Sequence, residues 1–183
     1  MPDSKHKKPP FINRSGFDTF FIGSRNRSTP ALLKKESQSR RPSLEELDTA
    51  YRSAVYEYIA PDKTLQEFRV DQRSDSLVKL LSVQGVNQAA FISACNPNGI
   101  ANPRHENLGR LFRLSFRIRD HDCAFLSGRG RDDSGHWPDE PSLMALGIDK
   151  SDAFKLAREF NQIAFIWVEK DGVPRLVYTE PSA

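Results

Sequence analysis

Cysteine is scarce in this sequence, which has two cysteines, Cys95 and Cys123, among 183 residues. Two cysteines make no disulfide framework of the kind that holds small secreted domains together, so we expect both thiols to be reduced. Long apolar runs are also absent, and none approaches the roughly 18 residues that a membrane-spanning helix needs. The N-terminus lacks the apolar core of a secretory signal. These absences predict a cytoplasmic protein that does not span a membrane.

Metal-binding motifs are missing as well. The residues with suitable side chains are His105, His121, His136, Asp122 and Cys123, but they show neither Cys-x-x-Cys nor His-Glu-x-x-His spacing. We therefore expect no metal site. No motif identifies a cofactor either.

The charge is unevenly distributed. Residues 1–42 hold ten Lys or Arg against three Asp or Glu, a net charge of +7, whereas residues 43–183 carry −4. The first segment is rich in Pro, Ser, Lys and Arg and has no hydrophobic period, which predicts a disordered basic tail. Its basic residues could contact the phosphates of a nucleic acid, or they could simply be solvated. The apolar stretch 17–22 could dock on the domain or on a protein partner.

Hydrophobic spacing between residues 43 and 183 predicts one domain. Ser43 and Glu46 fit a capping box, which starts the first helix. Helices are expected at about 44–58, 75–81, 103–118 and 150–160, strands at 65–70, 88–95, 121–126, 143–148, 163–168 and 173–178, and a polar loop at 127–137. This order predicts an α/β or α+β fold, with a mixed β-sheet flanked by about four helices.

The helix expected after Asn102 separates apolar from basic side chains. Asn102 is predicted to cap it and Pro103 to be its first helical residue. Its predicted apolar face consists of Leu108, Leu111, Phe112, Ser115 and Ile118. Its arginines, Arg110, Arg113, Arg117 and Arg119, lie largely on other faces. They could bind phosphate, although a solvated helix surface is the alternative.

A candidate site lies where the apolar run 88–95 ends. Asn96 follows the run directly, and Glu106 and Asn107 come near the start of the next helix. Side chains at a strand end and the amides of a helix N-terminus can face one point. The asparagine amides can orient a ligand, or they can serve the turn and the helix cap.

Two carboxylates are candidates for acid–base chemistry. The amides at a helix start favour the charged form of Glu106, whereas an aromatic wall at Trp137 could raise the pKa of Glu140. Carboxylates in unlike environments suit a general acid and a general base. Gln162 precedes another apolar run and could reach the same cluster. The alternative is that these residues only stabilise loops. Cys95 could be a nucleophile, but buried cysteines are more often small apolar fillers.

Several of these segments together resemble a bacterial family known as a domain of unknown function (DUF 3293). The resemblance covers roughly residues 47–178. The residues that carry it are Ala50-Tyr51, Tyr56, Phe91-Ile92-Ser93-Ala94, Asn96-Pro97, Glu106-Asn107, Trp137-Pro138, Glu140, Ser142, the helix 153–160, Gln162-Ile163-Ala164 and Val173-Pro174-Arg175-Leu176. The family commonly has an aromatic residue at the position of Cys95, which argues against a cysteine nucleophile. The resemblance implies a single cytoplasmic domain and supplies no reaction.

Two functions remain open on the sequence alone. The first is a small-molecule site for a nucleotide or another anionic metabolite, which could be enzymatic. Glu106 or Glu140 would then act as acid or base, and Asn96, Asn107, Trp137 and Gln162 would bind the ligand. The second is a binding module without chemistry, whose basic tail, residues 1–42, engages nucleic acid or a protein partner.

Overall fold

The computed structural model describes residues 42–135 and 137–179. The predicted tail, up to residue 41, lies outside the described residues, as does the apolar stretch 17–22. Tail disorder and tail binding therefore remain predictions. None of the helices in the described ranges has the length and hydropathy that crossing a lipid bilayer requires.

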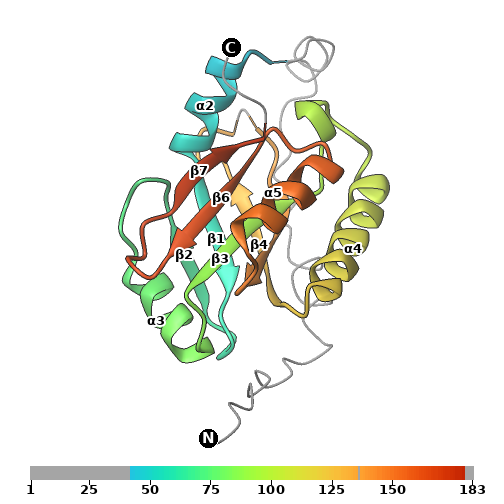
Figure 1. The fold of residues 1–183 in the computed structure, drawn as a ribbon. Coiled ribbons are helices and arrows are strands. Elements are labelled where there is room, and N and C mark those ends of the chain that lie inside the picture. Colours follow the sequence, from blue (N-terminus) through green and yellow to red (C-terminus); the bar gives the residue numbers. More distant parts are fainter. Residues whose placement is uncertain (1–41, 136, 180–183) are drawn as a thin grey trace, which may run out of the picture.

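The described chain forms four α-helices, one 3-10 turn and a seven-stranded sheet (Figure 1). The helices are α2 (Leu44–Ser53), α3 (Asp75–Gln84), α4 (Arg104–Asp120) and α5 (Lys150–Glu159), and the turn is η1 (Pro97–Gly99). The strands are β1 (Val55–Ile59), β2 (Leu65–Phe68), β3 (Gln88–Ser93), β4 (Ala124–Arg131), β5 (Glu140–Leu146), β6 (Ala164–Glu169) and β7 (Arg175–Tyr178). Their order in the sheet is β2-β1-β4-β5-β3-β6-β7.

The predicted fold class is confirmed, because one sheet is flanked by four helices. Every strand pairing among the described residues is antiparallel, however, so the sheet is not mixed as predicted. The strand missing from the prediction is β1. It pairs with β2 through a short connection and also with β4, which places β4 and β5 in the middle of the sheet.

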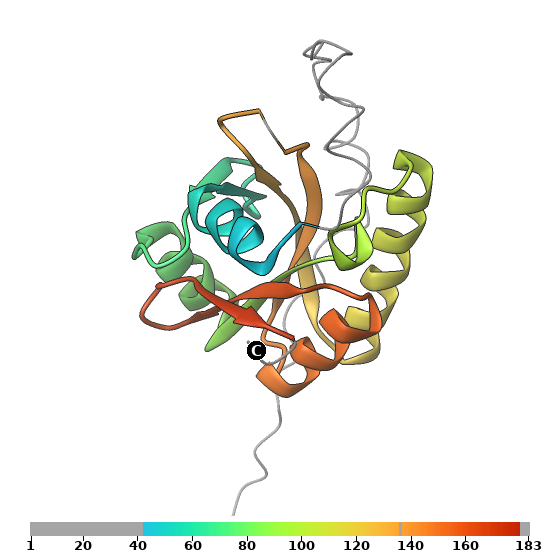
Figure 2. The same ribbon diagram turned by 90° about the horizontal axis from the view of Figure 1, so that it is seen from above.

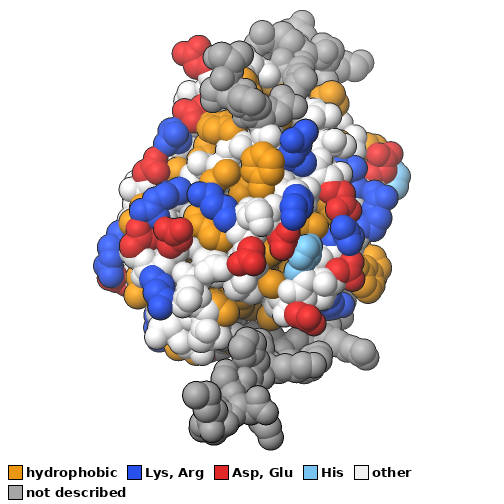
Figure 3. Space-filling view, in the orientation of Figure 1, with side chains coloured by type: hydrophobic (Ala, Val, Ile, Leu, Met, Phe, Trp, Pro, Cys, Tyr) orange, Lys and Arg blue, Asp and Glu red, His pale blue; other side chains and the backbone are white. Residues whose placement is uncertain are grey.

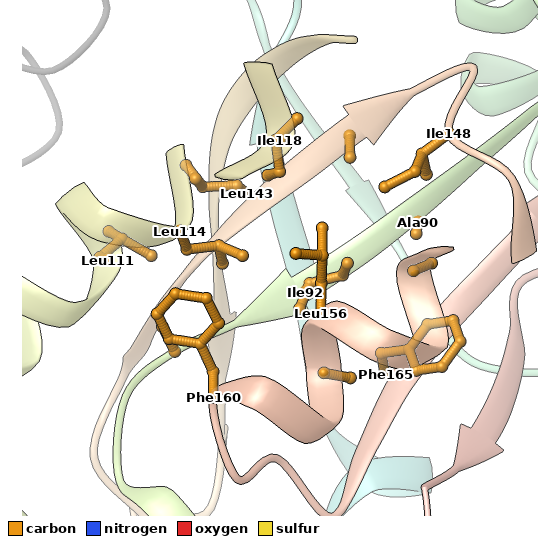
Figure 4. Close-up of a cluster of buried hydrophobic side chains, with 14 of the residues drawn as sticks. Ala90, Ile92, Leu111, Leu114, Ile118, Leu143, Ile148, Leu156, Phe160 and Phe165 are labelled. Atoms are coloured by element: carbon orange, nitrogen blue, oxygen red, sulfur yellow. The ribbon is translucent and has the colours of Figure 1, made fainter. Parts of the chain in front are cut away.

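The sheet is strongly curved, with two helices on each side (Figure 2). On the convex side, α4 and α5 cover a core that includes Ile92, Leu114 and Leu156 (Figure 4). On the concave side, α3 covers a core that includes Tyr58 and Phe91. Because neighbouring residues of a strand point to opposite faces, Phe91 and Ile92 of β3 contribute to different cores. This explains the continuous apolar run predicted for a strand covered on both faces.

The first helix is shorter than predicted. It has the predicted capping box, since Ser43 Oγ accepts a hydrogen bond from the Glu46 amide and the Glu46 side chain accepts one from the Ser43 amide. It ends at Ser53, and residues 55–58 belong to β1 instead. The reason is the local sequence: Tyr56 and Tyr58 bury their rings on the concave face, which only an alternating strand achieves for both.

The loop predicted at 127–137 is wrong over residues 127–131, which continue β4. Gly128 was misleading as a loop signal, because it is needed where the Phe91 ring crosses β4: a Cβ there would lie 2.4 Å from Phe91 Cε2. The arginines of this part of β4 also pair with a carboxylate. Buried Glu57 accepts hydrogen bonds from Arg129 Nε at 2.6 Å and Arg131 Nε at 2.8 Å.

Helix α4 differs in detail from its prediction. It begins at Arg104, because Pro103 is extended, and Asn102 does not cap it. Leu114 is buried in the convex core, while Phe112 is 53% exposed. The buried face of α4 therefore includes Leu114 in place of Phe112, which was predicted to lie on it.

Gly128→Ala is expected to destabilise the protein severely. The added methyl group would clash both with Phe91 and with the carbonyl oxygen of Glu57, at 2.5 Å, and overpacking of this kind costs about 3 kcal/mol. Gly109→Ala is the control: it lies in α4 with no atom within 4 Å of an added Cβ, and it should raise the free energy of unfolding by up to about 1 kcal/mol. Urea unfolding followed by circular dichroism measures both. Equal stability of the two variants would contradict the close packing.

Candidate functional site

Asn96 closes β3 and connects three segments at that end of the sheet. Its backbone is left-handed, with φ at 47° and ψ at 58°, which asparagine tolerates better than most residues. Its side-chain oxygen accepts hydrogen bonds from the Asn102 amide at 3.1 Å and from Asn107 Nδ2 at 2.9 Å. Its amide donates to Asn107 Oδ1 at 3.0 Å. Asn96 and Asn107, which the sequence analysis placed in one candidate site, therefore lie together and bond to each other.

Glu140 joins this network from the start of β5. Its Oε2 accepts a hydrogen bond from Asn96 Nδ2 at 2.9 Å. Although the residue keeps some exposed surface, burial of the carboxyl group raises its pKa, and the hydrogen bonds from Asn96 and Ser93 only partly oppose this. The direction is the one expected from the sequence. The carboxyl therefore holds its proton at pH values where an exposed glutamate is ionised.

The environment of Glu140 is tyrosine-rich rather than formed by Trp137. Glu140 lies opposite Gly130 in the sheet, and Gly130 lies opposite Tyr56 of β1. Burial raises the pKa of Tyr51 and of Tyr56, and the nearby Glu140 charge adds to both shifts. The Tyr56 hydroxyl donates to the Tyr51 carbonyl at 2.9 Å. These two tyrosines were part of the family resemblance but were not predicted as site residues.

Cys95 is unsuited to nucleophilic attack. Burial, reinforced by the Glu140 charge, raises the pKa of its thiol to about 12, so the thiolate is not populated near neutral pH. Gln162 is buried beside it and donates to the Cys95 carbonyl oxygen at 2.8 Å. Gln162 thus reaches the end of β3, but through the backbone rather than through Asn96 or Glu140.

Glu106 lies outside this network. It is exposed on the first turn of α4 and makes no hydrogen bond or ion pair within the described part of the chain. Trp137 is 38% exposed in the connection between β4 and β5, where its amide donates to Asp132 Oδ2 at 2.9 Å. Among the described residues, no hydrogen bond or ion pair joins either residue to Glu140.

An open depression borders α4 next to the network. Its lining residues are Asn102, Glu106, Gly109, Arg110 and Arg113. Asn102 is held through both of its backbone groups, because its N–H donates to Asn96 Oδ1 and its carbonyl oxygen accepts from Asn107 Nδ2 at 3.3 Å. The asparagine network therefore sets the position of one wall of the depression.

The depression continues along α4 toward α5. The adjoining hollow is lined by Arg110, Arg113, Phe116, Arg117, Glu159 and Phe160. Arg117 is already engaged there, since its guanidinium donates to Glu159 and to Asp120. Among the described residues, no group of His, Cys, Asp or Glu side chains could hold a metal ion.

A family model matches the part of the chain that contains the asparagine network and α4. Residues 92–165 match the model of the family described as "Protein of unknown function (DUF3293)". The matched segment runs from β3 through α4, β4, β5 and α5 into β6. The match confirms the resemblance over this segment, which is shorter than the predicted range 47–178. Neither a curated protein nor a solved structure matches the chain.

The DUF3293 match spans all six residues proposed from the sequence as site residues. They are Asn96, Glu106, Asn107, Trp137, Glu140 and Gln162. Two residues that line the depression, Arg110 and Arg113, were grouped in the sequence with other arginines of α4. Arg110 and Arg113 follow Glu106 by four and seven residues, so the three side chains lie along one line of the helix. This spacing is the sequence signal that separates these two arginines from the other arginines of α4.

Asn96→Gly is expected to lower the free energy of unfolding by about 2 kcal/mol. Glycine keeps the left-handed backbone but removes the side chain that bonds the Asn102 amide and the Glu140 carboxyl. Asn161→Gly is the matched control, because Asn161 is also left-handed, at φ 54°, is exposed, and makes no side-chain hydrogen bond among the described residues. It should change stability by no more than about 0.5 kcal/mol. Equal losses in urea unfolding would show that the network adds nothing beyond the backbone conformation.

Proposed function

We propose that this protein binds an anionic small molecule in the depression beside the N-terminal half of α4. The proposal keeps the small-molecule site expected from the sequence at the end of β3. It assigns the ligand contacts to Arg110, Arg113 and Glu106, and it gives Asn96, Asn107 and Glu140 the role of positioning the wall at Asn102.

Arg110 supports the proposal because its guanidinium is held in place before any ligand arrives. Its Nε donates to the Ala94 carbonyl at 2.6 Å, and its Nη2 donates to the Phe160 carbonyl. Neither acceptor carries a charge, so the positive charge is not neutralised by an ion pair. A side chain that is already ordered loses little conformational entropy on binding. The remaining Nη1 is the donor available to an anion.

The strongest support for the proposal comes from Arg113. It lines the same depression, is exposed, and has no ion pair among the described residues. Its neighbour Arg117 shows the usual alternative, since two carboxylates bind its guanidinium. Two uncompensated guanidinium groups in one hollow favour a carboxylate or a phosphate, which both accept paired N–H donors.

Glu106 narrows the class of ligand. A carboxylate in a hollow with two arginines accepts hydrogen bonds, so it favours a ligand that also bears hydroxyl or amino groups. Gly109 leaves space beside it, because no atom lies within 4 Å of an added Cβ. Nucleotides, phosphorylated polyols and hydroxy acids combine these features.

Thermal unfolding in the presence of AMP, glycerol phosphate or citrate tests this function. At about 100 times its dissociation constant, a bound ligand adds about 2.7 kcal/mol of stability, which raises Tm by about 5–10 °C. Arg113→Gln should weaken binding of the stabilising anion at least about tenfold, because a hydrogen bond to a charged group contributes about 1.5–3 kcal/mol.

Arg158→Gln is the control for this test. Arg158 is exposed on the neighbouring helix α5, has no ion pair among the described residues, and does not line the depression. Its removal should leave the affinity within about twofold, whereas equal weakening by both variants would indicate attraction by overall charge only. The proposal fails if none of the three classes of anion stabilises the protein.

A further inference from the structure

Helix α4 carries an unusual group of aromatic side chains on its solvent side. Phe112 is 53% exposed and Phe116 is 46% exposed, and their rings meet edge to face with centroids 4.7 Å apart. Single exposed apolar residues are common on protein surfaces, but a packed pair of large rings is not explained by that. Figure 3 shows hydrophobic side chains at the edge of the molecule formed by α4, bordered by both basic and acidic side chains.

Arg119 continues this line of side chains by one turn. Its guanidinium lies over the Phe116 ring at 5.8 Å and over the Phe125 ring at 5.1 Å. It has no ion pair among the described residues. Stacking on rings holds the guanidinium plane while its N–H groups at the edge remain available for an anion. We call Phe112, Phe116 and Arg119 the aromatic strip.

The aromatic strip and the depression occupy different lines of the helix. Residues 112, 116 and 119 follow one another at spacings of four and three, as do residues 106, 110 and 113 on the adjoining side. Phe112 and Arg119 line neither the depression nor the adjoining hollow, whereas Phe116 also lines that hollow.

We propose that the aromatic strip of α4 binds single-stranded nucleic acid, with bases stacking on Phe112 and Phe116 and a phosphate bound by Arg119. Unpaired bases offer flat faces that stack on aromatic rings regardless of sequence, and the strand supplies phosphates beside them. The charge of α4 is complementary to such a ligand. The helix carries five arginines against Glu106 and Asp120, although residues 43–183 as a whole carry −4.

Other occupants fit the aromatic strip less well. An acidic protein segment would engage Arg119 but has no need of two exposed rings. A second copy of the chain would place like charges of two α4 helices against each other, which is unfavourable. The proposal does not rest on the anion site, because the residues assigned to the anion, Arg110, Arg113 and Glu106, are not part of the strip, although Phe116 lines the adjoining hollow.

Fluorescence anisotropy with the full chain tests the aromatic strip. The probes are a labelled oligothymidylate of about 12 nucleotides and its duplex with oligoadenylate. The native chain should bind the single strand more tightly, since duplex bases are not free to stack. Phe112→Ala with Phe116→Ala should weaken single-strand binding at least about tenfold and remove the preference over duplex. Arg119→Gln should reduce the salt dependence by about one phosphate contact.

The control is Leu65→Ala with Val83→Ala. These residues are 51% and 70% exposed on β2 and α3, and their removal should not change the affinity. Circular dichroism confirms that each variant is folded. The proposal is overturned by absence of binding, by binding without strand preference, which basic residues alone would give, or by sedimentation showing that the rings pair two copies. The strip variants keep Arg113 and Glu106. A negative result with nucleic acid would therefore not contradict the proposal that an anion binds in the depression.

Discussion

The arrangement at the end of the sheet depends on the side chain of one residue, Asn96. Its left-handed backbone turns the chain out of β3, and its amide group links Glu140 of β5 to Asn102 and Asn107 on the way into α4. These bonds connect the paired strands β3 and β5 to the segment that leads into α4. They fix the direction in which α4 leaves the sheet, and with it the position of the arginines that line the depression.

The curvature of the sheet makes the enclosed setting of Glu140 possible. Gly128 lets the Phe91 ring lie directly on β4, and Gly130 leaves room for the Tyr56 ring against the same strand. The concave side therefore closes around aromatic side chains. Glu140 stands at the edge of this layer, where burial raises its pKa and Asn96 supplies a hydrogen bond. This favours a positioning role for Glu140 rather than direct contact with a ligand.

Local sequence patterns were sufficient to predict most of the helices and strands. They were insufficient where contacts between residues far apart in the sequence determine the structure. The helices α3 and α5 and the strand β3 have regular periods and clear ends, such as Gly85 in its left-handed C-cap. In contrast, the glycines of β4 look like loop residues until Phe91, far away in sequence, is placed against them. The site shows the same limit. Asn96 and Glu140 were both chosen from the sequence, but 44 residues separate them, and only the fold shows that they bond to each other while Glu106 does not join them.

The proposed anion site lies beside α4, at Arg110 and Arg113. A titration followed by NMR, with the anion that stabilises the protein most, tests it directly through the backbone amides and the Arg110 Nε–H group. We expect saturable shifts concentrated in residues 102–113, together with Ala94 and Phe160, whose carbonyl groups hold Arg110. Shifts that cluster elsewhere on the molecule while residues 102–113 stay unchanged would contradict it.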